Sequence, residues 1–559
     1  MKISSERTKR EIGFPEILAG ISPSTPFGKK RMADMKPYLP GDEARLEGEF
    51  DRLEKICYIL LAYKEETDKI ISIFSHFKEI SATFRKSKDE VLSTIELFEV
   101  KRFLLYTDEL RSICERIGVD MPGSFLTEDT TELLSELDPE GNRLPTFYIY
   151  DFFSEKLAEL RGEKKGRERD YRSEQKRLAA ELQREYGITL TPKFDLTVAR
   201  SDAARLEAAE HAAALQRGDE DNFSVTFKLR AGEKGRGLQA EIDELSALIE
   251  DEEFIVRKRL TKLVNKHSKR LIKNCQRIGE LDFVMAKGIY AVKHSCVRPK
   301  IVRIHTLRIE EGRYLPLERF LKSKGQEYNP VSIILDEGVT CITGANMGGK
   351  TISMKLAGLV AMMVQYGLFA PCKSVFAGLS SSIHILIGDS QDIQRGLSSF
   401  GSEMEELNRI LTDSGDRAMI FIDEIAGSTN PQEGRALTKS LLKYLSNKPY
   451  ISLMTTHFDH VADGQQGIVN LRVRGLADAD FDKLAGVLKT AGMKERIEIL
   501  TRLMDFRLER VGGDVEIPRE ALRIAEILGL KDEIIEGARE ILKADVQPGA
   551  MEMFKADVQ

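Results

Sequence analysis

No stretch of the sequence is long and apolar enough to cross a membrane. A run of about eighteen apolar residues is absent. The N-terminal MKISSERTKR also leads into no apolar segment of the kind that a signal peptide requires. We therefore expect a soluble protein with no membrane partner.

The cysteines lack the spacing of a zinc cluster or a disulfide framework. None forms a Cys-x-x-Cys pair, and the six are scattered as Cys57, Cys114, Cys275, Cys296, Cys341 and Cys372. This pattern fits a reducing environment, so we expect a cytoplasmic location.

An excess of positive charge is also missing, since 84 Lys and Arg residues stand against 90 Asp and Glu residues, for a formal net charge of -6. The whole chain therefore offers no cationic surface for nonspecific nucleic-acid binding. Basic runs occur at 7–10, 162–172 and 269–277. Each is either a local basic patch or, more simply, a solvated helix face. Interleaved aromatic and basic residues that would stack on nucleic-acid bases are absent as well.

The length of 559 residues allows three or four domains. Apolar residues three and four apart, as at 50–64 and 94–118, predict a helical scaffold up to about residue 125. A charged helix near 153–186 follows. Two alternating stretches at 188–199 and 222–232 then predict a small strand element carried between helices.

A heptad-like seam follows in a segment dense in charged residues. It consists of Leu238, Ile242, Leu245, Ile249, Val256, Leu260 and Leu263. The seam predicts a long helical arm, which is either a moving lever or a static bundle helix.

The C-terminal part of the chain shows a different pattern. Strand-like runs at 314–320 and 331–344 lead into alternating strands and helices. The segments 519–530 and 531–544 then predict two short amphipathic helices for dimerisation or packing.

One segment matches the phosphate-loop pattern G-x-x-x-x-G-K-[ST]. It consists of Gly344, Ala345, Asn346, Met347, Gly348, Gly349, Lys350 and Thr351. A strand-like run precedes it and a helix-like run follows it. A chance match in a Gly-rich turn would not be expected to have these two flanking elements. In such a loop backbone N–H groups surround phosphate oxygens, Lys350 reaches the β- and γ-phosphates, and the Thr351 hydroxyl ligates Mg²⁺. The segment therefore predicts a site for ATP and magnesium.

A second motif lies about seventy residues later, where an apolar strand ends in Asp423 and Glu424. Adjacent acids at a strand end are common on surfaces. Beside a phosphate loop, however, the aspartate would hold magnesium and the glutamate would act as general base on the attacking water.

Two further segments carry polar groups suited to the same site. A strand-like run at 449–459 contains Thr455, Thr456 and His457, and the histidine is either structural or a sensor of the γ-phosphate. The segment 388–411 contains Ser398, Ser399 and Glu403 at the start of a helix. Hydroxyls there either cap their own helix or bind an anion, such as the γ-phosphate of a second subunit.

Together these motifs resemble the MutS family of ABC-type ATPases. The resemblance lies in TGANMGGKT, GDSQDIQRGLSSFGSEMEELNRIL, FIDEIAGSTNPQEGRAL and TTHF, and it covers about residues 290–545. Residues 22–32 look like the start of the family's helical core. The resemblance implies a C-terminal α/β P-loop ABC-type ATPase domain, preceded by a mostly α-helical core and lever with a long helical arm.

We expect four domains on this basis: a helical core scaffold at 1–125, lever helices with a small strand-containing insertion at 126–300, the ATPase domain at 301–515, and a helical dimerisation element with a loose tail at 516–559.

The resemblance also implies roles for individual residues. Residues 344–351 would bind ATP and Mg²⁺, with Asp423 as the metal-associated aspartate and Glu424 as the catalytic base. His457 matches the family's switch histidine. Ser398 matches the signature serine that reaches the partner's nucleotide, which implies a homodimer with two composite sites.

The chain departs from the family at both ends. It begins almost at the core region, without recognisable mismatch-reading or connector domains, and it ends close to its last predicted helix, without a nuclease-like domain. We therefore expect neither mismatch reading nor built-in DNA cleavage.

Three functions remain open. The first is a clamp on mismatched or branched DNA whose arms are switched by ATP. The second is a remodeller of a protein client, similar to the short MutS-like ATPases associated with reactivation of adenosylcobalamin-dependent amino-acid aminomutases. The third is a slow conformational timer, against which the presence of Glu424 argues.

Overall fold

A computed structural model describes residues 3–343, 349–388, 399–427, 429–458, 461–462, 465–475, 492, 496, 505–511 and 520–542. The chain divides into two compact units. The first consists of Met1–Ile71, Ile117–Phe125 and Gly279–Gln559, and the second of Ser72–Arg116 and Leu126–Ile278.

The N-terminal part is helical, as predicted. Its helices are α1 (Glu6–Glu11), α2 (Phe14–Ala19), α3 (Pro26–Ala33), α4 (Glu43–Ala62), α5 (Lys64–Phe74), α6 (Ser81–Lys86), α7 (Thr94–Ile117) and α8 (Thr131–Leu137), with short 3-10 turns at Gly118–Asp120, Gly123–Phe125 and Asp151–Phe153. Thr25 caps α3 by accepting a hydrogen bond from the backbone of Gly28. The Asp282 carboxylate in turn accepts hydrogen bonds from the backbone N–H of Ser24 and Thr25, which fixes the start of α3 to a distant part of the chain.

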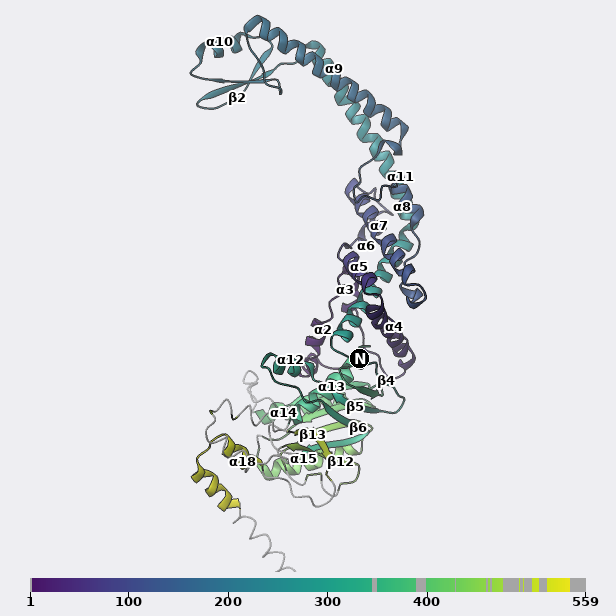
Figure 1. The fold of residues 1–559 in the computed structure, drawn as a ribbon, viewed down its shortest axis with the longest axis vertical. Helices are drawn as coiled ribbons and strands as arrows, with labels where there is room; N and C mark the ends of the chain where they lie inside the picture. Colours follow the sequence, from purple (N-terminus) through teal and green to yellow (C-terminus); the bar gives the residue numbers. More distant parts are fainter. Residues whose placement is uncertain are drawn as a thin grey trace, which may run out of the picture. The chain divides into compact units, whose positions relative to one another are not determined.

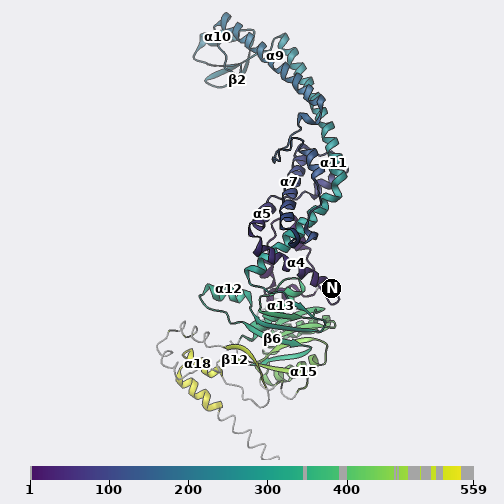
Figure 2. The same cartoon turned by 45° about the vertical axis from the view of Figure 1, so that its right-hand side comes forward.

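The second unit contains one long charged helix and most of another, whose last residues, from Gly279 on, belong to the first unit. Helix α9 (Glu155–Tyr186) agrees with the predicted charged helix, and α11 (Glu233–Lys293) extends the predicted arm to 61 residues. The two lie side by side in Figures 1 and 2, and Arg167 of α9 pairs with Glu241 of α11 at 2.9 Å. Four of the seven seam residues are buried, and the other three are half-buried. The buried ones are Leu238, Ile242, Val256 and Leu260, and the half-buried ones are Leu245, Ile249 and Leu263. Their burial confirms that the apolar period predicts a packed helix face.

A small domain lies where α9 ends and α11 begins (Figures 1 and 2). Its antiparallel sheet has the order β1-β3-β2 and is built from β1 (Asp195–Ala199), β2 (Leu215–Glu220) and β3 (Ser224–Leu229), with α10 (Ala203–His211) between β1 and β2. Its core is made of Leu182, Ile188, Leu196, Val198, Ala209, Ala212, Val225 and Phe227. Strands β1 and β3 fall in the two alternating stretches. We call this domain, residues 187–232, the tip.

The C-terminal part is an α/β domain, as predicted. A six-stranded sheet has the order β13-β12-β7-β11-β10-β9, and a four-stranded sheet has the order β4-β8-β5-β6. The strands are β4 (Lys300–Ile301), β5 (Thr306–Gly312), β6 (Val331–Asp336), β7 (Gly338–Thr343), β8 (Ser374–Ala377), β9 (Ser382–Ile387), β10 (Ala418–Asp423), β11 (Ile451–Thr455), β12 (Ile468–Gly475) and β13 (Asp505–Arg510). From β12 to β9 the neighbouring strands of the larger sheet pair in parallel, whereas β13 pairs antiparallel with β12 at the edge.

The strands nearest the centre of the larger sheet are continuous apolar runs in the sequence. Such runs are expected where helices cover both faces of a sheet, because no side chain of the strand then faces solvent. Every residue of β10 and β11 is buried. The covering helices are α13 (Lys350–Gln365), α14 (Ser399–Asp413) and α15 (Pro431–Ser446). Residues from β7, β10, α14 and α15 share one hydrophobic cluster, so the sheet edge that carries the predicted motifs rests on a packed core.

One predicted strand is wrong. Residues 314–320 were expected to be strand-like, but Leu315–Ser323 form α12. Pro316 stands in the first turn, where its missing N–H costs nothing. Tyr314 and Leu315 are both buried, and Arg319 and Phe320 are both exposed, so burial does not alternate along this segment as it would in a half-buried strand.

Near the C-terminus, α18 (Glu520–Ile527) and a helical segment at 532–542 correspond to the two predicted amphipathic helices. Within the described residues, no helix has both the length and the apolar character needed to span a membrane. The proposed domain boundaries near 125, 300 and 515 stay predictions.

Candidate nucleotide site

The predicted motifs meet at one edge of the six-stranded sheet. Strand β11 lies between β7 and β10, and all three are parallel. In register, Thr455 pairs with Asp423 on one side and with Ile342 on the other. The carboxyl ends of these strands therefore bring together segments that are more than one hundred residues apart, at the edge where parallel α/β sheets bind ligands.

The phosphate-loop segment is described only at its end, because Gly344, Ala345, Asn346, Met347 and Gly348 lie outside the described residues. Gly349 has φ of 77°, a left-handed conformation that glycine adopts without strain, and it directly precedes α13. Lys350 and Thr351 thus stand in the first turn of α13, where the helix presents unpaired N–H groups and a positive end.

Each of these two side chains contacts one member of the acidic pair. The Thr351 hydroxyl donates to Asp423 Oδ2 at 2.7 Å, and Lys350 Nζ lies 3.0 Å from Glu424 Oε1. Lys350 is only 4% exposed, whereas Glu424 is 33% exposed. The lysine is therefore held in the interior, and the glutamate stands at the border with solvent, where a general base can meet water.

The donors at this edge fit magnesium. A hydroxyl and a carboxylate are oxygen ligands, and Mg²⁺ is usually held by one or two carboxylates together with substrate phosphates and waters. In the part of the chain that the structure describes, no group of three or more His, Cys, Asp and Glu side chains could hold a metal by itself. Thr351 and Asp423 are thus the pair that would share the ion with bound phosphates.

Thr455 fixes the position of both acids. Its hydroxyl donates to Asp423 Oδ1 and accepts a hydrogen bond from the backbone N–H of Glu424 at 3.2 Å. Glu424 has φ of 48°, an uncommon conformation for a residue with a side chain. The threonine therefore helps to hold a strained turn that aims the glutamate, a role that the sequence alone did not reveal.

Glu403 of α14 provides a second support. Its carboxylate accepts a hydrogen bond from the backbone N–H of Ala426, which also has positive φ, at 3.2 Å. Burial raises the pKa of Glu403. The sequence places Glu403 near the start of a helix, but the contact with the turn after Glu424 depends on tertiary structure.

The two remaining candidate site residues are His457 and Ser398. His457 is exposed just beyond the end of β11, with its ring 4.3 Å from the ring of Phe458. A Cβ built on Gly427 would lie 3.7 Å from the histidine ring, so His457 stands beside the turn that follows Glu424. Ser398 lies outside the described residues. The roles of both stay predictions.

Replacing Thr455 by valine should lower ATP turnover and destabilise the fold by about 1–3 kcal/mol, because the buried Asp423 and the Glu424 N–H lose a partner. Chemical unfolding and steady-state hydrolysis measure the two effects. Ser452→Ala is a matched control on the same strand, since its buried hydroxyl has no hydrogen-bond partner among the described residues. Equal stability and turnover of wild type and Thr455→Val would contradict the support role.

Comparison with known proteins identifies the C-terminal region. Residues 340–544 match MutS domain V, which contains the phosphate-loop segment, the acidic pair and His457. The C-terminal region is therefore a MutS domain V, an ATPase domain.

Relatives extend the similarity toward the N-terminus. An Endonuclease MutS2 of Symbiobacterium thermophilum is 32% identical over 51% of this chain and 32% of its own length. An Endonuclease MutS2 of Carboxydothermus hydrogenoformans is 26% identical over 97% of this chain and 65% of its own length. The DNA mismatch repair protein MutS of Aquifex pyrophilus is 24% identical over 89% of this chain and 57% of its own length. Three further Endonuclease MutS2 proteins are matched over only about a third of their own length.

Proposed function

We propose that two copies of this chain form an ATP-hydrolysing switch that acts on DNA. The observation that carries the proposal is the double contact of Thr351 with Asp423 and of Lys350 with Glu424. It unites, at one sheet edge, a phosphate-binding lysine, a pair of magnesium ligands and a carboxylate base, which are the groups that phosphoryl transfer to water requires.

Each side chain has a separate task. Lys350 neutralises the β- and γ-phosphates. Thr351 and Asp423 would hold magnesium, which would supply charge stabilisation as phosphate oxygens gain negative charge. Glu424 orients the attacking water and takes up its proton. Because Lys350 lies 3.0 Å from Glu424, phosphates that attract the lysine compete with the glutamate for its charge. ATP binding therefore frees the base at the moment when it is needed.

A path for conformational change starts at the same helix. Helix α13 begins at Lys350 and ends at Gln365, and the Gln365 amide donates to the backbone oxygens of Tyr38 and Ser380. Just beyond, the backbone oxygen of Gly367 accepts a hydrogen bond from Lys287 of α11. Nucleotide bound at one end of α13 is thus connected to the long helix by hydrogen bonds at the other end, which supports a lever role for α11.

DNA is the proposed substrate for two reasons. The relatives are named for DNA mismatch repair and as endonucleases. In addition, residues 257–277 of α11 contain nine Lys and Arg and no Asp or Glu. The exposed ones are Lys258, Arg259, Lys262, Lys266, Lys269, Arg270 and Lys273. We call this segment the basic stripe. Lys266, Arg270 and Lys273 pair with Glu132 or Glu128. The other exposed lysines have no ion-pair partner among the described residues and suit contacts with phosphates.

The test is the rate of ATP hydrolysis with four-way-junction, mismatched and homoduplex DNA at low and physiological salt. We expect stimulation that survives physiological salt. Reversing the charge of Lys262 and Lys269, which have no ion-pair partner among the described residues, should raise the DNA concentration for half-maximal stimulation about 10-fold through lost phosphate contacts.

The matched control reverses Lys55 and Lys69, which are also exposed but lie outside the basic stripe. An equal loss in both double variants would mean that only net charge matters. Steady basal turnover with no response to any DNA would contradict DNA as the substrate.

A second candidate is ATP-driven remodelling of a protein client, such as an adenosylcobalamin-dependent aminomutase that needs reactivation. The formal net charge of -6 favours it over a general DNA-binding role. Stimulation of hydrolysis by a purified aminomutase, and not by DNA, would establish this alternative.

A further inference from the structure

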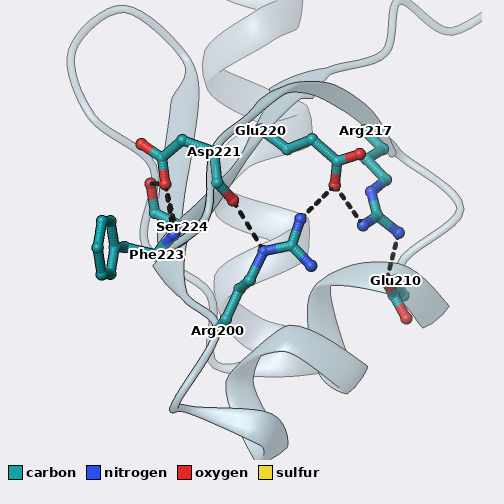
Figure 3. Close-up of polar contacts among 7 residues, drawn as sticks. All are labelled: Arg200, Glu210, Arg217, Glu220, Asp221, Phe223 and Ser224. Carbon is teal, nitrogen blue, oxygen red and sulfur yellow. Dashed lines mark hydrogen bonds and ion pairs between the residues drawn. The ribbon is translucent and has the colours of Figure 1, made fainter.

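The tip presents an aromatic side chain to solvent. Phe223 lies in the connection between β2 and β3 and is 81% exposed, more than any other aromatic side chain in the described residues. In Figure 3 its ring points away from the other labelled side chains. The tip has an apolar core in which an aromatic side chain, Phe227, is buried. The exposure of Phe223 is therefore not explained by the absence of such a core.

Hydrogen bonds hold Phe223 in this position. Asp221 Oδ1 accepts from the backbone N–H of Phe223 at 2.7 Å and of Ser224 at 2.6 Å. From the other side, Arg200 donates its backbone N–H to the oxygen of Phe223 at 2.8 Å and its side-chain Nε to the oxygen of Asp221 at 2.9 Å. The ring is therefore presented by a braced turn, and little conformational freedom remains to be lost when it is buried.

The cations near Phe223 are already paired. Arg200 lies 2.8 Å and Arg217 lies 2.6 Å from the carboxylate of Glu220, and Arg217 also contacts Glu210 (Figure 3). The N–H groups of Phe223 and Ser224 lower the pKa of Asp221, which is therefore charged at neutral pH. Asp219 beside it is exposed, with Lys228 at 3.6 Å. The surroundings of the ring are thus weakly acidic.

The whole tip has the same balance. Residues 187–232 contain six Lys and Arg against seven Asp and Glu, in contrast with the basic stripe of α11. A surface with no cationic excess has little attraction for phosphates, so nucleic acid is a poor occupant. A large, pre-ordered aromatic ring is instead typical of the anchor residues of protein interfaces.

We propose that residues 219–224 form a docking surface for a protein whose own surface presents an apolar pocket bordered by Lys and Arg. The ring supplies the buried area of the contact, because a phenylalanine covers roughly 150–250 Å². Asp219 and Asp221 supply complementary charge that orients the partner. This contact concerns a surface separate from the basic stripe and holds whether or not DNA is the substrate.

Site-specific photocrosslinking tests the proposal in cells. Benzoylphenylalanine replaces Phe223 in the full-length chain, and the matched control carries it at Phe152, which is 76% exposed in the same unit but lies outside the tip. We expect position 223, and not 152, to crosslink to a protein. That protein, once purified, should bind full-length wild type at least about 10-fold more tightly than Phe223→Ser, as for an interface anchor. Phe152→Ser should bind as wild type does, and Asp219→Lys should bind more weakly.

Four results would overturn the proposal: crosslinks from position 223 to nucleic acid, crosslinks to a second copy of the chain, no crosslink at all, or a purified partner whose affinity is unchanged by Phe223→Ser. Basal and DNA-stimulated ATP hydrolysis of Phe223→Ser should equal those of wild type, since the residue lies outside the nucleotide site. Failure of the docking proposal is thereby distinguishable from failure of the DNA proposal.

Discussion

Replacing Glu424 by glutamine should reduce ATP hydrolysis about 10²- to 10⁴-fold, the usual contribution of a general base, while ATP binding remains. Glutamine preserves the shape of the side chain and can still contact Lys350, but it cannot accept the proton of the attacking water. The backbone of this residue is held by Thr455, so the substituted side chain starts from the same turn. The variant should therefore accumulate the ATP-bound state.

Single-turnover hydrolysis and equilibrium binding of a fluorescent ATP analogue measure the two effects separately. Glu433→Gln is the control, because Glu433 is an exposed acid in the first turn of α15 with no assigned role. Wild-type hydrolysis by Glu424→Gln would remove this residue from the chemistry.

Replacing Lys350 by alanine should weaken ATP binding about 10- to 100-fold, in line with the loss of a hydrogen bond between charged groups in a buried position. Hydrolysis should fall to background, since the charge that stabilises the β- and γ-phosphates is lost. Lys350 is 4% exposed, so solvent cannot replace it easily.

Lys355→Ala is the control for this second variant. Lys355 lies on the same helix, and its ammonium contacts Glu11 at 3.6 Å rather than the acidic pair. Its loss should leave binding unchanged. If Lys350→Ala binds ATP as wild type does, the first turn of α13 is not the phosphate site.

Local patterns in the sequence predicted the segments that meet at the candidate site. The phosphate-loop glycines, the apolar run before Asp423 and the run before Thr455 are each defined by residues close in sequence. Their order and context predicted an α/β domain, which the structure confirms. The insertion of β11 between β7 and β10 was not predictable in the same way, since strand order depends on long-range packing.

Three features of the structure were not predicted from the sequence, and each has a physical reason. Strand β2 reads LQRGDE and is mostly exposed, so it lacks the apolar alternation by which β1 and β3 were recognised. Helix α12 was mistaken for a strand because its apolar run is short, and short runs fit both periods. The contact of Glu403 with Ala426 joins two elements far apart in sequence, and no local pattern encodes it.

We propose that two copies of the chain close each ATP site, with Ser398 of one copy serving the nucleotide on the other. Co-expression of differently tagged Lys350→Ala and Ser398→Ala chains, followed by tandem purification, gives mixed dimers whose ATP hydrolysis can be measured. In a shared arrangement one site of each mixed dimer keeps both its own Lys350 and the partner's Ser398, so we predict partial recovery of hydrolysis relative to either pure variant. Folded mixed dimers with no recovery would contradict the claim.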